Sequence, residues 1–416
     1  MKKLIYFIAL MPLLSVQAQS ESSPGSSLYA DVQQYVAFGE HRTGTPADTA
    51  TSAWIKQRLE ADGFKTSYVS FPIRQFFPEK SYVKIGMHIQ LDAFPLWHIE
   101  KSAYDVKGIL TDDQSQGSFA DRIVLTRIPP GGQTNAQIIA QLSAIIKKGA
   151  KAIVAVTQNE TGELVAYNAL DNQPPWKIPV VLLAPKDTTA LLQAIQQQQQ
   201  VEINVKGVIK SIQARNVLGR IGTGSNYVVI STPISGWFTC GGERGPGVAV
   251  FLALAKWVSD KKLPYTFLFT ANTGHELDNH GAHIFLNHYA PKPDSVKLWV
   301  HLGAAVATLG YQQTNEAVKQ LPVADDKRNI MYSENLDSLV HIAFNNEPGK
   351  RWKVKEKAVG ELEVVANHGY TTYLGIAQGF RYHHTRKDDA STTSPEILES
   401  ITRALEKLLE GYLNDK

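Results

Sequence analysis

The stretch YTFLFTANTGHELDNHG, residues 265–281, decides the fold class of this chain. It opens with an apolar run rich in aromatic residues, typical of a buried strand, and leads into Gly274-His275-Glu276. Residues 227–233 repeat the pattern, and the polar loop after them carries Glu243. Open α/β sheets keep their reactive groups at the carboxyl ends of their strands. We therefore expect adjacent strand ends to carry Glu243, His275 and Glu276.

Strands and helices alternate over the second half of the chain. This alternation predicts an α/β fold: a three-layer αβα sandwich with a mainly parallel central sheet. The last helix is amphipathic, with Ser394 as its N-cap and Pro395 in its first turn. The other expected elements are strands at 227–231, 265–270 and 297–300, and helices at 247–259 and 282–288.

Residues 103–210 differ from the rest of the chain in their residue pattern. They contain short strands rich in valine and isoleucine, separated by one helix at 137–148. We interpret this segment as an inserted, smaller strand-rich domain. The main domain is then formed by residues 19–102 and 211–416.

Residues 1–18 are typical of a secretory signal peptide. Lys2-Lys3 precede an apolar core from Leu4 to Val16, and small residues end at a cleavage site after Ala18. We expect an exported protein, periplasmic or secreted. No later apolar run is long enough for a membrane span, and the net charge of +3 is nearly balanced. We therefore expect neither a membrane nor a nucleic-acid partner.

Several short motifs, taken in order, resemble those of secreted zinc aminopeptidases: bacterial leucine aminopeptidase-like di-zinc peptidases with an inserted protease-associated domain. The resemblance covers nearly all of the chain after the signal peptide and implies the same fold, with 103–210 as the protease-associated domain. The matching motifs are FGEHRTGTP (38–46), GAKA (149–152), NVLG (216–219), GPGVA (245–249), GHE (274–276) and HT (384–385).

The resemblance also implies which positions would bind metal. Two ligand positions of the family fall on Pro233 and Gly303, which cannot bind a metal ion. The retained ligands would be Glu243, Glu276 and His384. Two carboxylates and one imidazole suit a catalytic zinc with an open position for water. The sequence thus predicts one zinc ion or none. His275 would take the place of the family's catalytic base.

Other residues near these motifs have two interpretations each. Arg244 could hold the carboxylate of a substrate, or it could form an ion pair with Glu243 or Glu276 and so neutralise a metal ligand. His301 could reach the pocket as a substrate-binding residue, or it could be a core histidine. Asp388 is a candidate to orient the imidazole of His384.

Cys240, the lone cysteine, lies three residues before Glu243. It could be a nucleophile activated by nearby positive groups, although a lone cysteine is more often a small buried hydrophobe.

Two functional hypotheses follow from the sequence. The first is a hydrolase of peptide or small amide substrates that uses a single zinc and His275 as general base. The second is a catalytically inactive relative that binds a peptide or small ligand. The loss of two ligands favours the second hypothesis, and the three ligands that remain favour the first.

Overall fold

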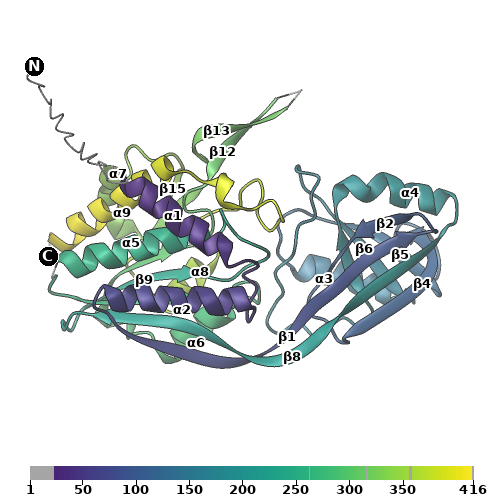
Figure 1. The fold of residues 1–416 in the computed structure, drawn as a ribbon, viewed down its shortest axis with the longest axis horizontal. Helices are drawn as coiled ribbons and strands as arrows, with labels where there is room; N and C mark the ends of the chain where they lie inside the picture. Colours follow the sequence, from purple (N-terminus) through teal and green to yellow (C-terminus); the bar gives the residue numbers. More distant parts are fainter. Residues whose placement is uncertain (1–22, 262, 315–316, 356–357, 415–416) are drawn as a thin grey trace, which may run out of the picture.

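The chain forms two units joined by a long two-stranded ribbon (Figure 1). This computed structural model describes residues 23–261, 263–314, 317–355 and 358–414, so the predicted signal peptide lies outside the described residues. The ribbon consists of β1 (Lys65–Ile85) and β8 (Gln200–Ile221). The two strands are antiparallel and pair along nearly their whole length, so they carry the chain into the smaller unit and back.

Within the described residues, a fourteen-stranded sheet extends through both units. In the larger unit the four central strands, β10, β9, β11 and β16, are parallel to one another. This arrangement confirms the predicted α/β class with a mainly parallel central sheet. In sheet order, the strands of the larger unit are β15 (Lys350–Lys353), β14 (Asn329–Tyr332), β16 (Tyr373–Ala377), β11 (Val296–Leu302), β9 (Tyr227–Pro233), β10 (Thr266–Asn272) and β8.

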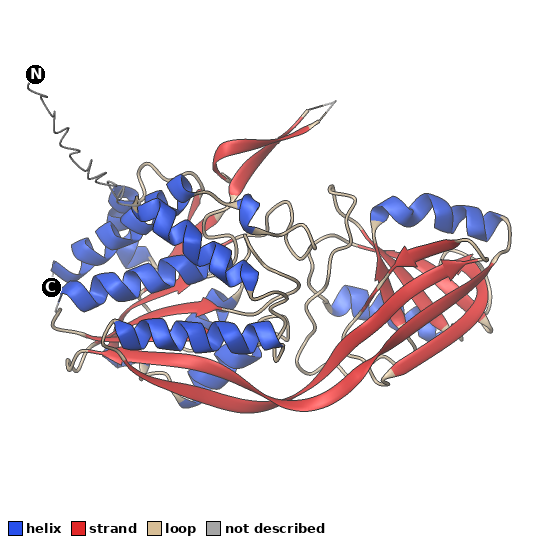
Figure 2. Cartoon of the chain, viewed as in Figure 1, coloured by secondary structure: helices blue, strands red, loops and turns tan. Residues whose placement is uncertain are grey.

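Helices cover both faces of this part of the sheet (Figure 2). Successive strand residues point to opposite faces, so Val228 and Ile230 of β9 join one core while Val229 joins another. The first face is covered by α1 (Pro24–Ala37), α2 (Pro46–Ala61), α5 (Gly245–Lys261), α7 (Asp337–Ala343) and α9 (Pro395–Asn414). The second face is covered by α6 (His280–His288) and α8 (Glu361–Asn367).

The C-terminal helix α9 begins at Pro395, as predicted. Its apolar stripe lies in the core of the first face with α1 and α5. The buried residues of the predicted stripe are Ile397, Leu398, Ile401, Leu405, Leu408 and Leu409.

The smaller unit has a hydrophobic core of its own. That core includes most of the apolar residues of the predicted insertion, and it also draws on earlier residues such as Phe76 and Trp97 and on Trp237 from the larger unit. Its elements are β2 (Ile89–Asp92), β3 (Phe94–Pro95), β4 (Ala103–Asp112), β5 (Arg122–Ile128), β6 (Ala152–Thr157), β7 (Val180–Leu183), α3 (Ala136–Lys147) and α4 (Thr188–Gln196).

A hairpin of β12 (Leu309–Gln313) and β13 (Val318–Ala324) projects from the larger unit on the side of the smaller one (Figure 1). Within the part of the chain that the structure describes, no helix combines the length and apolar character that a membrane span requires.

Candidate functional site

The predicted site residues lie at the carboxyl edge of the parallel strands, as such sheets require. Glu243 and Arg244 precede α5 in the loop that follows β9, and His275 and Glu276 follow β10. His301 lies near the end of β11, and His384 follows β16. Glu243, Arg244, Glu276, His301 and His384 are all buried.

Glu243 lies between a guanidinium and an imidazole. Its Oε1 is 2.7 Å from Nη2 of Arg244 and 3.2 Å from Nε2 of His384. The side chains of Glu243 and Arg244 are both inaccessible to solvent. Burial alone would raise the pKa of Glu243, but the charges of Arg244 and His384 hold that pKa well below its usual range. The carboxylate is therefore ionised. The ion pair foreseen as one interpretation of Arg244 is formed.

His384 is oriented by the smaller unit. Its Nδ1 is 3.0 Å from the carbonyl oxygen of Ala166, so Nδ1 carries the proton and Nε2 faces Glu243. Asp388, which we expected to orient this imidazole, instead accepts hydrogen bonds from the backbone N–H groups of Gly242 and Glu243. The expectation was wrong because Asp388 fixes the loop before α5, and a backbone carbonyl performs the orienting role.

His383 joins Glu243 and His384 in a cluster that could hold a metal ion. Among the described residues, these three offer ligand atoms that all lie within 4.8 Å of one another. The rings of His383 and His384 stack with centroids 3.9 Å apart. Nδ1 of His383 and Oε2 of Glu243 are buried and have no hydrogen-bond partner within the described chain. Sequence reasoning put forward His384 of this histidine pair and missed His383.

Glu276 makes other contacts. Its Oε1 accepts a hydrogen bond from the backbone N–H of Thr43 at 2.6 Å, and its Oε2 accepts one from Oγ of Ser235 at 2.9 Å. In the described part of the chain, the structure therefore brings Glu243 and His384 together, but it does not place Glu276 in that cluster. Glu276 connects the loop after β10 to the segment before α2 and to the loop after β9.

His275 and His301 lie against a buried carboxylate, Glu361, which sequence reasoning missed. Nδ1 of His275 is 3.2 Å from Oε1 of Glu361, and Nε2 of His301 is 3.9 Å from Oε2. Nδ1 of His301 is also 2.9 Å from Oγ of Ser231. Burial lowers the pKa of His275 well below its usual value and that of His301 to about 4, so both imidazoles are neutral at pH 7.

Cys240 is a buried residue whose thiol donates to the carbonyl oxygen of Trp237 at 2.7 Å. Burial raises the pKa of this thiol well above its usual value, and the carboxylate of Glu243 adds to the effect. A nucleophilic cysteine needs a lowered pKa and access to substrate. The structure thus favours the interpretation of Cys240 as a small hydrophobe.

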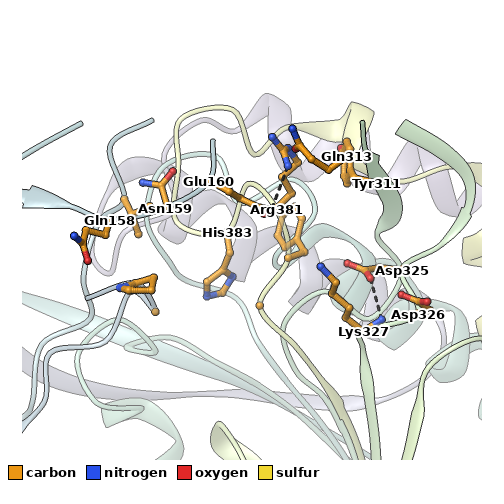
Figure 3. A pocket seen from close by; sticks show the side chains of 16 residues that line it. Gln158, Asn159, Glu160, Tyr311, Gln313, Asp325, Asp326, Lys327, Arg381 and His383 are labelled. Atoms are coloured by element: carbon orange, nitrogen blue, oxygen red, sulfur yellow. Dashed lines mark hydrogen bonds and ion pairs between the residues drawn. The ribbon is translucent and has the colours of Figure 1, made fainter. Parts of the chain in front are cut away.

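Two pockets meet at His383. The inner pocket has a volume of about 310 Å³ and is lined by Arg244, His275, His301 and Glu361 among others. The outer pocket, of about 680 Å³, lies between the two units and is drawn in Figure 3. His383 and Gly379 line both pockets, so a ligand that occupies both would pass His383, one member of the candidate metal cluster.

Both units contribute walls to the outer pocket. Gln158, Asn159 and Glu160 come from the smaller unit, and Figure 3 shows His383 between these residues and Lys327 of the larger unit. Glu160 and Arg381 form an ion pair of 3.1 Å across the pocket. The smaller unit therefore shapes the approach to the site.

The fold has solved relatives among zinc aminopeptidases. An aminopeptidase from Aneurinibacillus sp. superposes with a TM-score of 0.64 at 14% identity, covering 92% of this chain and 93% of that one. A zinc aminopeptidase from Bacillus subtilis gives 0.72 at 14% identity, with coverages of 93% and 94%. A peptidase M28 precursor from Shewanella amazonensis gives 0.71 at 15% identity, with coverages of 93% and 92%.

No family model matches this sequence, and a search of curated proteins also finds no match. At 14–15% identity, the structural likeness establishes the fold and leaves the chemistry to be argued from the site.

Proposed function

We propose that this chain is an exported, peptidase-like hydrolase that cleaves a peptide or amide bond with one zinc ion held by Glu243, His383 and His384. The observation that carries the proposal is the convergence of these three side chains, of which His383 lines both pockets and the other two are buried behind it. The zinc aminopeptidase fold of the solved relatives supports it. Export rests on the signal-like residues 1–18.

The donor set fits zinc. Two imidazoles and one carboxylate are a ligand set found in catalytic zinc sites, which keep a fourth position for water. Nε2 of His384 lies 3.2 Å from Oε1 of Glu243, so the two atoms are close enough to bind the same ion. The unpartnered Oε2 of Glu243 offers a further ligand atom.

When bound, zinc lowers the pKa of a bound water to about 7 and so supplies a nucleophile near neutral pH. His275 lines the inner pocket and is neutral at that pH, so its Nε2 can take a proton while Nδ1 stays against Glu361. Glu361 is then a positioning residue that fixes the ring of His275.

A second candidate function has an observation of its own. The ion pair between Arg244 and Glu243 satisfies one oxygen of the only carboxylate in the described metal-ligand cluster, and a guanidinium beside that oxygen repels a second cation. This contact favours a peptide-binding or small-ligand-binding protein without hydrolytic activity.

Metal analysis of the purified mature protein separates the two candidates. After incubation with zinc and removal of excess metal, we expect one zinc per chain by elemental analysis. His383→Ala should lose the ion, whereas Glu276→Gln should keep it, because both oxygens of Glu276 are used by Thr43 and Ser235. His280→Ala is the matched histidine control, since His280 pairs with Asp171 outside the cluster.

Three results would count against the hydrolase proposal. A parent protein that binds no zinc would leave the binding-protein candidate. Loss of zinc in Glu276→Gln, with full retention in His383→Ala, would assign the ligands differently. A zinc-loaded protein that hydrolyses none of a broad panel of aminoacyl amides, dipeptides and N-acylated amino acids would remove the catalytic role.

A further inference from the structure

The guanidinium of Arg244 has one nitrogen without a partner. The side chain is fully buried, Nε donates to the carbonyl oxygen of Ser235 at 3.0 Å, and Nη2 contacts Glu243. Neither Nη1 nor Nη2 has a hydrogen-bond partner among the described residues, and the contact of Nη2 with Glu243 is an ion pair. A buried, unpaired N–H of a charged group is costly, so a structure that retains one calls for a ligand or water at that position.

The unpaired nitrogen belongs to a residue that lines the inner pocket. The imidazoles of His275 and His301, which are neutral at pH 7, and the amides of Asn329 and Gln378 line the same pocket. Glu361 is the only carboxylate among the described lining residues, and burial raises its pKa. Arg244 is therefore the one arginine or lysine among the described lining residues, and although Nη2 is paired with Glu243, its Nη1 can still form a charge-assisted hydrogen bond.

We propose that the inner pocket binds the carboxylate end of a peptide or of an N-acylated amino acid, with Arg244 as the partner of the carboxylate. A volume of about 310 Å³ suits one terminal residue, and the outer pocket of about 680 Å³ receives the rest of the chain past His383. This places the substrate's carboxyl end innermost.

The proposal refines the proposed function at the same site, because it names the polarity of the substrate. Joined to hydrolysis at the cluster of Glu243, His383 and His384, it predicts release of a C-terminal residue. That is the specificity of a carboxypeptidase or a dipeptidase, in contrast to the aminopeptidases that share the fold. The binding step itself requires no metal.

A pair of ligands of equal shape tests the proposal on the unaltered protein. N-acetyl-L-leucine carries a carboxylate, and N-acetyl-L-leucinamide replaces it with a neutral amide. By isothermal titration calorimetry at pH 7, we expect the acid to bind at least about tenfold more tightly than the amide. The preference should persist in protein stripped of metal with a chelator. Equal affinities, or tighter binding of the amide, would overturn the proposal.

A conservative variant tests whether the carboxylate of the ligand binds at Arg244. Arg244→Lys keeps the charge beside Glu243 but loses the planar fork, so the preference for the acid should fall several-fold. Arg386→Lys is the matched control, because Arg386 is exposed, pairs with Glu40 and lines neither pocket. A preference unchanged in Arg244→Lys would place the carboxylate elsewhere.

The stripped protein separates this proposal from the hydrolase proposal. A preference that appears only in zinc-loaded protein would assign the carboxylate to the metal and would also overturn the role of Arg244. A preference for the acid in a protein that binds no zinc would support Arg244 while the hydrolase proposal fails.

Discussion

Replacement of Arg244 by methionine should strongly destabilise the protein. The variant removes a guanidinium that lies 2.7 Å from the carboxylate of Glu243 and donates to the carbonyl oxygen of Ser235. Both charged side chains are inaccessible to solvent. Removal of one partner of a buried pair leaves an uncompensated charge and costs about 3–5 kcal/mol of unfolding free energy.

The double variant Arg244→Met/Glu243→Gln shows whether the cost comes from the pair. A neutral amide removes the orphaned charge, so the double variant should be more stable than the sum of the single effects predicts. We expect a coupling energy of about 2 kcal/mol or more. Urea unfolding in metal-free buffer at pH 7, followed by tryptophan fluorescence, measures each free energy, and equal slopes against urea concentration show that the compared states match.

Zinc supplies a further test of the same pair. Without the guanidinium, the cluster of Glu243, His383 and His384 presents less positive charge to an incoming cation, so zinc should stabilise Arg244→Met more than the parent. Binding at a hundredfold excess over Kd contributes about 2.7 kcal/mol. A single variant that costs under about 1 kcal/mol, with no coupling to Glu243→Gln, would refute this account of the ion pair.

Two other predictions concern a buried histidine and the packing around two glycines. His41 is fully buried, and burial lowers its pKa to about 3, so between about pH 6.5 and 3 the unfolded state binds a proton that the folded state does not. The free energy of unfolding therefore decreases as the pH decreases. Between pH 6.5 and 4, the free energy of unfolding measured with urea should decrease by about 3 kcal/mol less in His41→Phe than in the parent, and equal decreases would contradict this. A Cβ on Gly281 would lie 2.0 Å from the carbonyl oxygen of Thr273, whereas one on Gly379 would lie 3.9 Å from its nearest neighbour. Gly281→Ala should thus cost about 1–3 kcal/mol and Gly379→Ala under about 0.5 kcal/mol, and similar thermal unfolding midpoints for both would show that the loop after β10 is not tightly packed.

The helices and strands of the larger unit were largely predictable, because the pattern of buried side chains sets the spacing of apolar residues along the sequence. The strand expected at 265–270 is β10 at 266–272, and the helix expected at 247–259 is α5 at 245–261. Apolar residues on both sides of β9 indicate a strand covered on two faces, which is the mark of a central parallel strand.

The ribbon was not predictable in the same way. β1 extends from Lys65 to Ile85 because it pairs with β8 along nearly its whole length. Its partner lies more than a hundred residues away in the sequence, and its outer residues are partly exposed, so no local apolar pattern marks the pairing. Only the tertiary structure supplies the neighbour that keeps this segment extended.

The positions of the site residues along the sequence did not predict where their side chains point. Strand ends placed Glu243, His275 and Glu276 at one edge, yet adjacent residues on a turn point in different directions. Glu276 points toward Thr43 and Ser235, while His275 faces Glu361. Glu361 is the first residue of the short helix α8, which follows Gly360. In the sequence it cannot be told from an acidic residue that only stabilises the first turn of a helix. Its role follows only from the tertiary contacts that bring it to His275 and His301.

The position of Arg244 connects the lost ligands to the proposed chemistry. Pro233 and Gly303, which stand where the resemblance implies two metal ligands, line the inner pocket together with Arg244. The guanidinium is a permanent positive charge that Glu243 and the carbonyl oxygen of Ser235 hold in place. It cannot activate a bound water as a metal ion does, but its Nη1 can donate a charge-assisted hydrogen bond to a carboxylate. In our two proposals, hydrolysis therefore depends on the cluster of Glu243, His383 and His384, and Arg244 selects the substrate.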